Sequence, residues 1–355
     1  MKRIHLLITI VAGWLSACFS HIYGMPPTEA AGDTITLAMV GDIMMGTTYP
    51  DTLLPYKDGA FLFRDTKQVL RRADIALGNL EGPLCDGGKS TKKDTLNNYA
   101  FRTPTSFAPL LRDAGFDFLS MANNHANDFG EEGILSTEQA LHGQGIKYAG
   151  VKGRFEAAVI KRKGKRIGIC AFGHNPYTLR HTDLQTVKRV ILALQNRADI
   201  IVVSFHGGAE GRTRSHLPYG KEEFFKENRG SLRELAHYCI DLGADVGYGH
   251  GPHVVRCVEV YKGRFIAYSL GNFCTPYGIS LKGISGQAPV VEIKINGEGQ
   301  FLSGRIHSFV QRRGLGPRWD KNKGAARQMK MLSEADVPAS SAAIDHQGNI
   351  RMKRR

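Results

Sequence analysis

The sequence predicts an α/β fold in which two β-sheets pack face to face and helices cover their outer faces. From residue 34 to residue 248, apolar strand-like segments alternate with segments whose apolar residues recur at helical spacing. From residue 254 onward the pattern changes to strands joined by short turns, which is typical of antiparallel hairpins. An alternating series followed by antiparallel strands predicts two packed sheets with the helices outside.

The alternating part predicts a βαβ series. Its strands are expected at residues 34–40, 73–77, 116–120, 199–204 and 244–248. Its helices are expected at residues 60–72, 107–114, 130–144, 184–195 and 231–241. Gly115 and Gly243 follow two of these helices, at the position where glycine commonly ends a helix.

Antiparallel pairs complete the predicted domain. Residues 159–160 and 166–169 flank Lys163-Gly164-Lys165, which indicates a hairpin turn. Further strands are expected at residues 254–261, 264–270, 289–295 and 301–309. Residues 85–99 show no periodicity and are expected to form a substrate loop near the functional site. We expect one folded domain over residues 34–310.

The N-terminus predicts an exported protein. Lys2 and Arg3 precede an apolar stretch, residues 6–15, of the length of a signal-peptide core, so residues 1–24 are predicted to be a leader and residues 25–33 a linker. Leu15-Ser16-Ala17-Cys18 resembles a bacterial lipobox, in which Cys18 is lipidated and anchors the protein to the membrane. The alternative is ordinary cleavage near Tyr23-Gly24, which gives a secreted or periplasmic protein. Either interpretation places the domain outside the cytoplasm.

The C-terminus carries much of the formal net charge of +14. Basic residues recur from Arg312 to Arg355 among few apolar ones, so residues 311–355 are predicted to form a mobile tail. A cluster of like charges attracts polyanions. Because the leader argues against nucleic acid, the expected partner is an anionic polymer or a phosphorylated envelope component.

Polar residues follow the predicted strands at one end. MANNHANDFG, residues 121–130, follows the strand at 116–120, and Asp42, Glu81, His206 and His250 occupy similar places elsewhere. Because open α/β sheets bind ligands beyond the carboxyl ends of their strands, these side chains are expected to converge. The alternative for the central segment is a loop in which Asn and Asp only cap a helix and support turns.

The residue types favour a metal site. Three histidines, His206, His250 and His253, could combine with the carboxylates of Asp42 and Glu81 in a nitrogen and oxygen set suited to zinc, manganese or iron. A metal-free glycosidase pair of Asp42 and Glu81 would leave the histidines unexplained. The segment YSLGNF lacks the GxSxG form of a serine nucleophile and is interpreted as scaffold near the site.

A family resemblance rests on six motifs in order. These are GDIMMG, GNLEGPL, MANNHANDFG, SFHGG, GHGPHV and AYSLGNF. Together they resemble the CapA-type poly-γ-glutamate capsule synthesis family, a branch of the calcineurin-like metallophosphoesterases. The resemblance implies an αββα sandwich and a divalent metal cofactor.

The resemblance assigns metal ligands by position. Asp42 matches the aspartate of the first motif, but Met44 stands where many superfamily members have a histidine. In the second motif, Asn79 and Glu81 are the candidates for the usual bridging aspartate. These departures leave open whether one ion or two are bound. The last motifs supply His206, and His250 with His253 as a pair that has one extra residue between them.

The third motif combines a ligand with an acid. By resemblance, Asn124 binds metal and His125 protonates the leaving group. Asp128 or a neighbouring amide is expected to orient His125, although Asp128 could instead cap the following helix.

The expected function is that of an envelope-anchored CapA-like protein with a metal-dependent hydrolase site, acting in biosynthesis, export or attachment of an anionic polymer such as poly-γ-glutamate. One alternative is a general periplasmic or cell-surface metallophosphoesterase. Another is a non-catalytic polymer-binding lipoprotein on the same fold, which Met44 favours.

Overall fold

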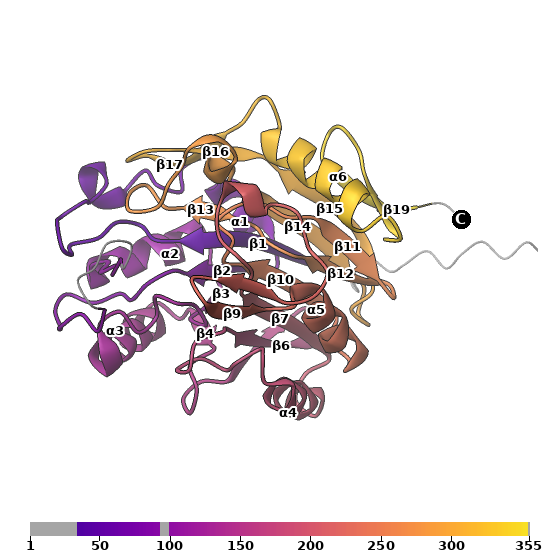
Figure 1. Ribbon diagram of the computed structural model, residues 1–355, viewed down its shortest axis with the longest axis horizontal. Helices are drawn as coiled ribbons and strands as arrows, with labels where there is room; N and C mark the ends of the chain where they lie inside the picture. Colours follow the sequence, from indigo (N-terminus) through magenta and orange to yellow (C-terminus); the bar gives the residue numbers. More distant parts are fainter. Residues whose placement is uncertain (1–33, 93–98, 354–355) are drawn as a thin grey trace, which may run out of the picture. The chain divides into compact units, whose positions relative to one another are not determined.

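The computed structural model of the chain describes residues 34–92 and 99–353 (Figure 1). The predicted leader with Cys18 and the predicted linker, residues 25–33, lie outside the described residues. Within the described ranges, no helix combines the length and the hydropathy that crossing a bilayer requires.

The larger sheet contains the N-terminal strands and the C-terminal hairpins. Its strand order is β18-β19-β15-β14-β1-β2-β3-β4, and β13 also pairs with β1. β1, β2, β3 and β4 run parallel, whereas β14 pairs with β1 antiparallel. The strands are β1 Ile35–Ile43, β2 Ile75–Leu80, β3 Phe118–Ser120, β4 Lys147–Ala149, β13 Asn272–Cys274, β14 Val290–Ile295, β15 Phe301–His307, β18 Ala342–Ile344 and β19 Asn349–Met352.

The smaller sheet has the order β11-β12-β10-β7-β6-β5. β6, β7, β10 and β12 run parallel, and β5 and β11 are antiparallel edge strands. Its strands are β5 Ala157–Arg162, β6 Lys165–Phe172, β7 Ile200–His206, β10 Val246–His250, β11 Val258–Tyr261 and β12 Arg264–Ala267. Two separate hairpins are β8 Glu222–Phe224 with β9 Glu227–Gly230, and β16 Phe309–Arg312 with β17 Gly316–Trp319.

Alternation along the strands explains why the sheets pack face to face. In β1, Leu37 and Met39 belong to the core between the sheets, whereas Ala38 and Val40 belong to the core under the outer helices. β7 is divided in the same way, with Val202 in the inner core and Val203 in an outer one. Since successive strand residues face opposite sides, each sheet is apolar on both faces and is covered on both.

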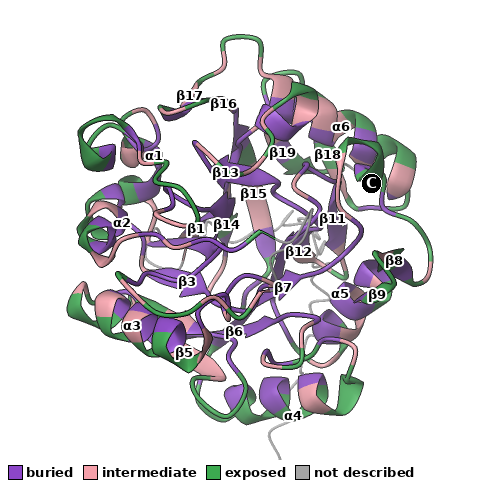
Figure 2. Cartoon of the chain, turned by 60° about the vertical axis from the view of Figure 1, so that its left-hand side comes forward, coloured by how far each residue is buried: buried purple, intermediate pink, exposed green. Residues whose placement is uncertain are grey.

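Helices cover the outer faces (Figure 2). The larger sheet packs against α1 Lys67–Arg72, α2 Ala108–Ala114 and α3 Gly130–Gly143. The smaller sheet packs against α4 Leu184–Gln195 and α5 Leu232–Asp241. The predicted α/β fold, a two-sheet αββα sandwich, is therefore confirmed. The predicted helix at residues 60–72 is shorter than expected, because α1 begins only at Lys67.

The predicted mobile tail over residues 311–355 is wrong. Its described residues, 311–353, include the end of β16, β17, α6 Gly324–Asp336, β18 and β19, and β19 pairs with β15. Ala326, Met329 and Leu332 of α6 are buried against the sheets, whereas Arg327 is exposed. The apolar residues are few, but they recur every three positions and so form one buried helix face. The charge count of the segment concealed this pattern.

The docking of α6 gives a stability prediction. Leu332→Ala should lower the free energy of unfolding by about 2–5 kcal/mol, because it leaves a cavity around a fully buried side chain. The matched control is Met331→Ala, whose side chain is exposed and whose loss should change stability by less than about 0.5 kcal/mol. Urea unfolding followed by circular dichroism measures both. Equal effects of the two variants would show that α6 does not pack as described.

Candidate metal centre

Three donors from two sheets meet at the carboxyl ends of parallel strands. Asp42 lies near the end of β1, His206 ends β7 and His250 ends β10. One possible ligand atom from each of the three lies within 4.8 Å of the other two, and all three side chains are fully buried. β7 and β10 pair in register, with His206 opposite His250. The sandwich therefore brings Asp42 together with two histidines that lie more than 150 positions later in the sequence.

Several polar atoms of the predicted ligands are buried without a hydrogen bond. Within residues 34–92 and 99–353, this holds for both ring nitrogens of His206, Nδ1 of His250, Oε1 of Glu81 and Oδ1 of Asn124. Buried polar groups are almost always hydrogen-bonded, so such a group of exceptions calls for an explanation. A mixed set of imidazole nitrogens and carboxylate or amide oxygens fits a divalent transition metal.

Both histidines of the cluster are neutral imidazoles at neutral pH. Burial lowers the pKa of His206 well below its ordinary value, and it lowers the pKa of His250 to about 3. Ser204 Oγ lies 2.9 Å from His250 Nε2, which leaves Nδ1 as the nitrogen available to an ion. Because a metal binds the unprotonated nitrogen of a neutral ring, burial prepares these residues as ligands.

The second motif supplies one candidate ligand and one positioning residue. Asn79 donates from Nδ2 to Asp42 Oδ1 at 2.9 Å and also to Glu81 Oε2, while its own Oδ1 accepts a bond from Asn123 at 3.0 Å. Glu81 Oε2 lies 3.4 Å from His206 Nε2. Asn79 therefore holds the two carboxylates at a fixed separation, and Glu81 is the member of the motif that keeps an oxygen for an ion.

His253 is bound to Asp42 rather than open to a ligand. Its Nδ1 lies 2.9 Å from Asp42 Oδ2 and 3.0 Å from Asn272 Oδ1. Burial would lower the pKa of His253, but the bond to Asp42 and the charges of Glu210 and Glu81 raise it to about 10. In this arrangement His253 is a charged partner that fixes the orientation of the Asp42 carboxylate.

Asn272 is a site residue that sequence reasoning missed. It lies in the AYSLGNF motif, which was interpreted as scaffold. β13 pairs with β1 in parallel and places Asn272 opposite Asp42, and the Asn272 amide donates to the carbonyl of Ser285 at 3.1 Å. Its position directly after an apolar segment is the same signal that identified Asp42 and His206.

The third motif places an imidazole and a carboxylate together. His125 Nδ1 lies 2.9 Å from Asp128 Oδ2, and the same oxygen accepts the Phe101 amide at 2.7 Å. The ring of Phe101 lies 4.4 Å from that of His125, measured between centroids. Asp128 does not cap α3, whose preceding residue is Phe129 and which has no side-chain cap. The carboxylate therefore serves to hold His125.

The predicted substrate loop contributes a residue that its composition did not single out. Lys92 Nζ lies 3.1 Å from Asp128 Oδ1 and 3.2 Å from His125 Nδ1. Thr91 ties this part of the loop to the motif, because its hydroxyl donates to the Asn127 carbonyl at 2.7 Å. Lys92 thus adds a cation to the His125–Asp128 pair.

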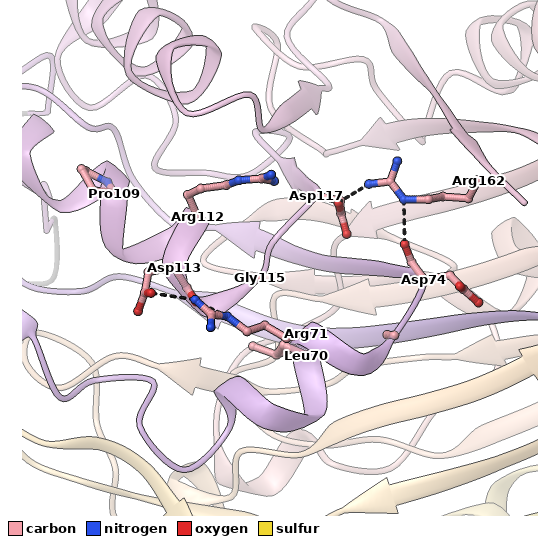
Figure 3. A pocket seen from close by; sticks show the side chains of 10 residues that line it. Leu70, Arg71, Asp74, Pro109, Arg112, Asp113, Gly115, Asp117 and Arg162 are labelled. Carbon is pink, nitrogen blue, oxygen red and sulfur yellow. Dashed lines mark hydrogen bonds and ion pairs between the residues drawn. The ribbon is translucent and has the colours of Figure 1, made fainter.

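A cavity at the opposite end of the parallel strands is a weaker candidate. It has a volume of about 610 Å³ and is lined by residues that precede β2 and β3 (Figure 3). Its charged groups mostly pair with each other, as in the contacts of Arg71 with Asp113 and of Arg162 with Asp117, both at 2.7 Å. The metal centre, in contrast, contains buried atoms that lack a bond within the described part of the chain.

Comparison with known proteins identifies relatives of the chain. The family described as bacterial capsule synthesis protein PGA_cap matches residues 36–277. Capsule biosynthesis protein CapA of Bacillus anthracis is 28% identical over 273 residues, which cover 71% of this chain and 62% of that protein. PGA biosynthesis protein CapA of Bacillus subtilis (strain 168) is 29% identical over 285 residues, which cover 76% of this chain and 70% of that protein. The chain thus spans less than two thirds of the Bacillus anthracis protein.

A solved structure overlaps with the fold at low sequence identity. The 5'-nucleotidase precursor of Thermus thermophilus is 15% identical, and the match covers 86% of this chain and 59% of that chain with a TM-score of 0.44.

The buried donor set predicts which substitutions empty the centre. His206→Ala or His250→Ala should weaken metal binding by more than the roughly 10–100-fold typical of losing an outer-shell partner, so the purified full chain should hold less metal than wild type. His125→Ala should retain metal, because the His125 ring is bonded to Asp128 rather than open to an ion. His237→Ala, which removes a histidine bonded to Glu259 instead, is the matched control. Elemental analysis measures metal per chain, and wild-type content in His206→Ala would contradict this assignment.

Proposed function

The chain belongs to the PGA_cap family of bacterial capsule synthesis proteins, and we propose that it acts in the biosynthesis, export or attachment of an anionic capsule-type polymer through a metal-dependent hydrolytic site. Family membership supports the polymer. The carrying observation for the hydrolytic site is the convergence of Asp42, His206 and His250, buried and within 4.8 Å.

The residues that would hold the ion are Asp42, Glu81, Asn124, His206 and His250. When bound, a divalent metal supplies Lewis-acid activation of water and of the scissile carbonyl or phosphoryl oxygen. The protein holds these donors in position and excludes water from them. His253 and Asn79 do this for Asp42, since each of its oxygens receives one of their hydrogen bonds.

His125 is the proposed general acid. Asp128 accepts the Nδ1 proton of His125 at 2.9 Å, which fixes the ring and leaves Nε2 as the atom that gives a proton to the leaving group. Phe101 packs against the ring and limits the access of water to it. The adjacent Asn124 and His125 therefore have different tasks, one in holding the ion and one in moving a proton.

The presence of Met44 favours the binding of one metal ion rather than two. It stands where many superfamily members have a histidine, and its side chain is 1% exposed. Its terminal methyl packs so closely against Gly278 that a Cβ at that position would lie 2.8 Å from it. A thioether packed in this way is a poor ligand for a divalent ion that prefers nitrogen and oxygen. The donors named above are therefore proposed to bind one ion.

The proposed substrate or partner is a polyanion of the cell envelope. Exposed basic residues of the folded C-terminal segment, Arg312, Arg313, Lys321 and Arg327, would attract it through their long-range field. A general phosphoesterase that uses the same centre is the alternative hydrolase, and a substrate screen separates the two.

The proposed location is the outer side of the membrane. It rests on the lipobox-like Leu15-Ser16-Ala17-Cys18, with Cys18 lipidated.

Removal of the acid tests the hydrolytic mechanism. His125→Ala should keep metal and lower kcat about 10²–10⁴-fold on phosphoester or γ-glutamyl substrates with poor leaving groups, the usual contribution of a positioned acid. The loss should shrink for leaving groups acidic enough to depart unprotonated. The control is His142→Ala, an exposed histidine of α3. Wild-type rates in His125→Ala on poor leaving groups would exclude this role. A metal-loaded wild type that turns over no substrate would leave polymer binding as the function.

Replacement of Cys18 tests the anchor. Cys18→Ala should release the protein from membranes into the soluble fraction, because it removes the acylated residue. Fractionation and immunoblotting measure the distribution. A Cys18→Ala protein that stays entirely with the membrane would show that the anchor lies elsewhere.

A further inference from the structure

A row of charged residues beside the metal centre connects two of its histidines. His253 Nε2 lies 3.9 Å from Glu210 Oε2, and Glu210 Oε1 accepts a bond from Arg229 Nη1 at 2.8 Å. At the other end, His174 Nδ1 lies 3.4 Å from the carbonyl oxygen of His206, and the two rings stack with centroids 5.7 Å apart. The row therefore borders the centre on two sides.

Arg229 is a rigid member of this row. It belongs to β9, and its side chain is only 4% exposed. Besides the bond to Glu210, its guanidinium lies over the ring of Phe224 at 5.3 Å, and its Nε is buried with no hydrogen-bond partner in the described part of the chain. A guanidinium held in this way is preorganised for a ligand with a planar pair of oxygens.

The backbone next to Glu210 is held in place by a buried ion pair. The buried Arg256 makes a two-bond contact with Glu222, each at 2.7 Å, and Glu222 also accepts the amide of Ala209 at 2.9 Å. Ala209 directly precedes Glu210 in the chain. The ion pair fixes the backbone at Glu210 and so fixes the carboxylate that orients Arg229.

Glu227 closes the row with a carboxylate that is half exposed. Its Oε2 lies 3.0 Å from Arg229 Nη2 and 3.6 Å from His174 Nε2. The His174 side chain is 3% exposed, and within residues 34–92 and 99–353 its Nε2 has no hydrogen bond. Two buried, fixed groups thus face one carboxylate whose own side chain is 51% exposed.

The contrast in burial identifies which member can move. Glu227 follows the turn of the β8–β9 hairpin, where Phe225 and Lys226 have positive φ values and Phe225 is 71% exposed. Because half of the Glu227 side chain is exposed, its carboxylate can move into solvent, and Arg229 then keeps its bond to Glu210. Arg229 and His174 stay in place because their other contacts lie within the fold.

We propose that Arg229 and His174 form a subsite for a substrate carboxylate beside the metal centre, and that Glu227 occupies this subsite when substrate is absent. The inference rests on the proposed function and names its substrate class: a molecule with a carboxylate close to the bond that is cleaved, such as a γ-glutamyl chain.

The charge balance favours a carboxylate over a phosphate. With Glu227 displaced, the single positive charge of Arg229 is shared between Glu210 and the incoming group, and His174 adds one hydrogen-bonding nitrogen. A single negative charge then fits better than the nearly double charge of a phosphate monoester, which the carboxylate of Glu210 would repel more strongly.

The test is binding of γ-glutamylglutamate to the full chain, measured by isothermal titration calorimetry at fixed ionic strength. Glu227→Gln should bind this dipeptide about tenfold more tightly than wild type, because the competing carboxylate is gone. Arg229→Met should bind it at least about tenfold more weakly than wild type, because a charge-assisted bond is lost. The matched control is Glu223→Gln, which removes the same charge from the same hairpin but faces Lys221.

The outcomes separate the subsite from the metal centre. Equal affinity of Glu227→Gln and Glu223→Gln, or no binding by any variant, would overturn the proposal. A gain in Glu227→Gln for inorganic phosphate alone would overturn the carboxylate assignment. Metal content is measured on the same samples. If wild type holds no metal but Glu227→Gln still gains affinity for the dipeptide, the subsite stands and the hydrolytic function fails.

Discussion

The buried carboxylate of Asp42 is the contact on which the site depends. One of its oxygens accepts a hydrogen bond from Asn79, and the other is bonded to His253. His206 and His250 approach it from the second sheet. A carboxylate with no exposed surface is costly unless cations and donors surround it. That requirement explains why polar side chains from both sheets converge at one point, and why two histidines remain neutral there while a third is charged.

The two-sheet architecture supplies this convergence. Parallel strands of both sheets end at the same side of the molecule. β1, β2 and β3 therefore position the carboxylate and amide donors, and β7 and β10 position the histidines. The segment after β7 then adds Glu210, and the β8–β9 hairpin adds Arg229 and Glu227. Buried groups from the sheets lie deepest, and the half-exposed Glu227 carboxylate lies at the surface. A site that holds its metal ligands in place but exchanges its substrate needs this order of burial.

The fold class and most residues of the candidate site could be predicted from the sequence, because both depend on local patterns. Polar residues directly after apolar strands marked Asp42, Glu81, Asn124, His206 and His250. Pairing between distant segments was not visible, so Asn272 was assigned to the scaffold although β13 lies beside β1. The C-terminal segment was misjudged because its charge conceals a narrow apolar face at Met329 and Leu332. The roles of Glu210, Arg229 and His174 depend on contacts across a hairpin, which no spacing in the sequence reveals.

Anomalous diffraction from crystals of the metal-loaded protein would show whether Asp42, His206 and His250 together hold an ion. We expect one strong peak at about 2.0–2.2 Å from an Asp42 oxygen and from ring nitrogens of His206 and His250, the range typical of such ligands. A peak elsewhere in the chain, or Asp42, His206 and His250 arranged as described with no peak between them at saturating metal, would contradict it.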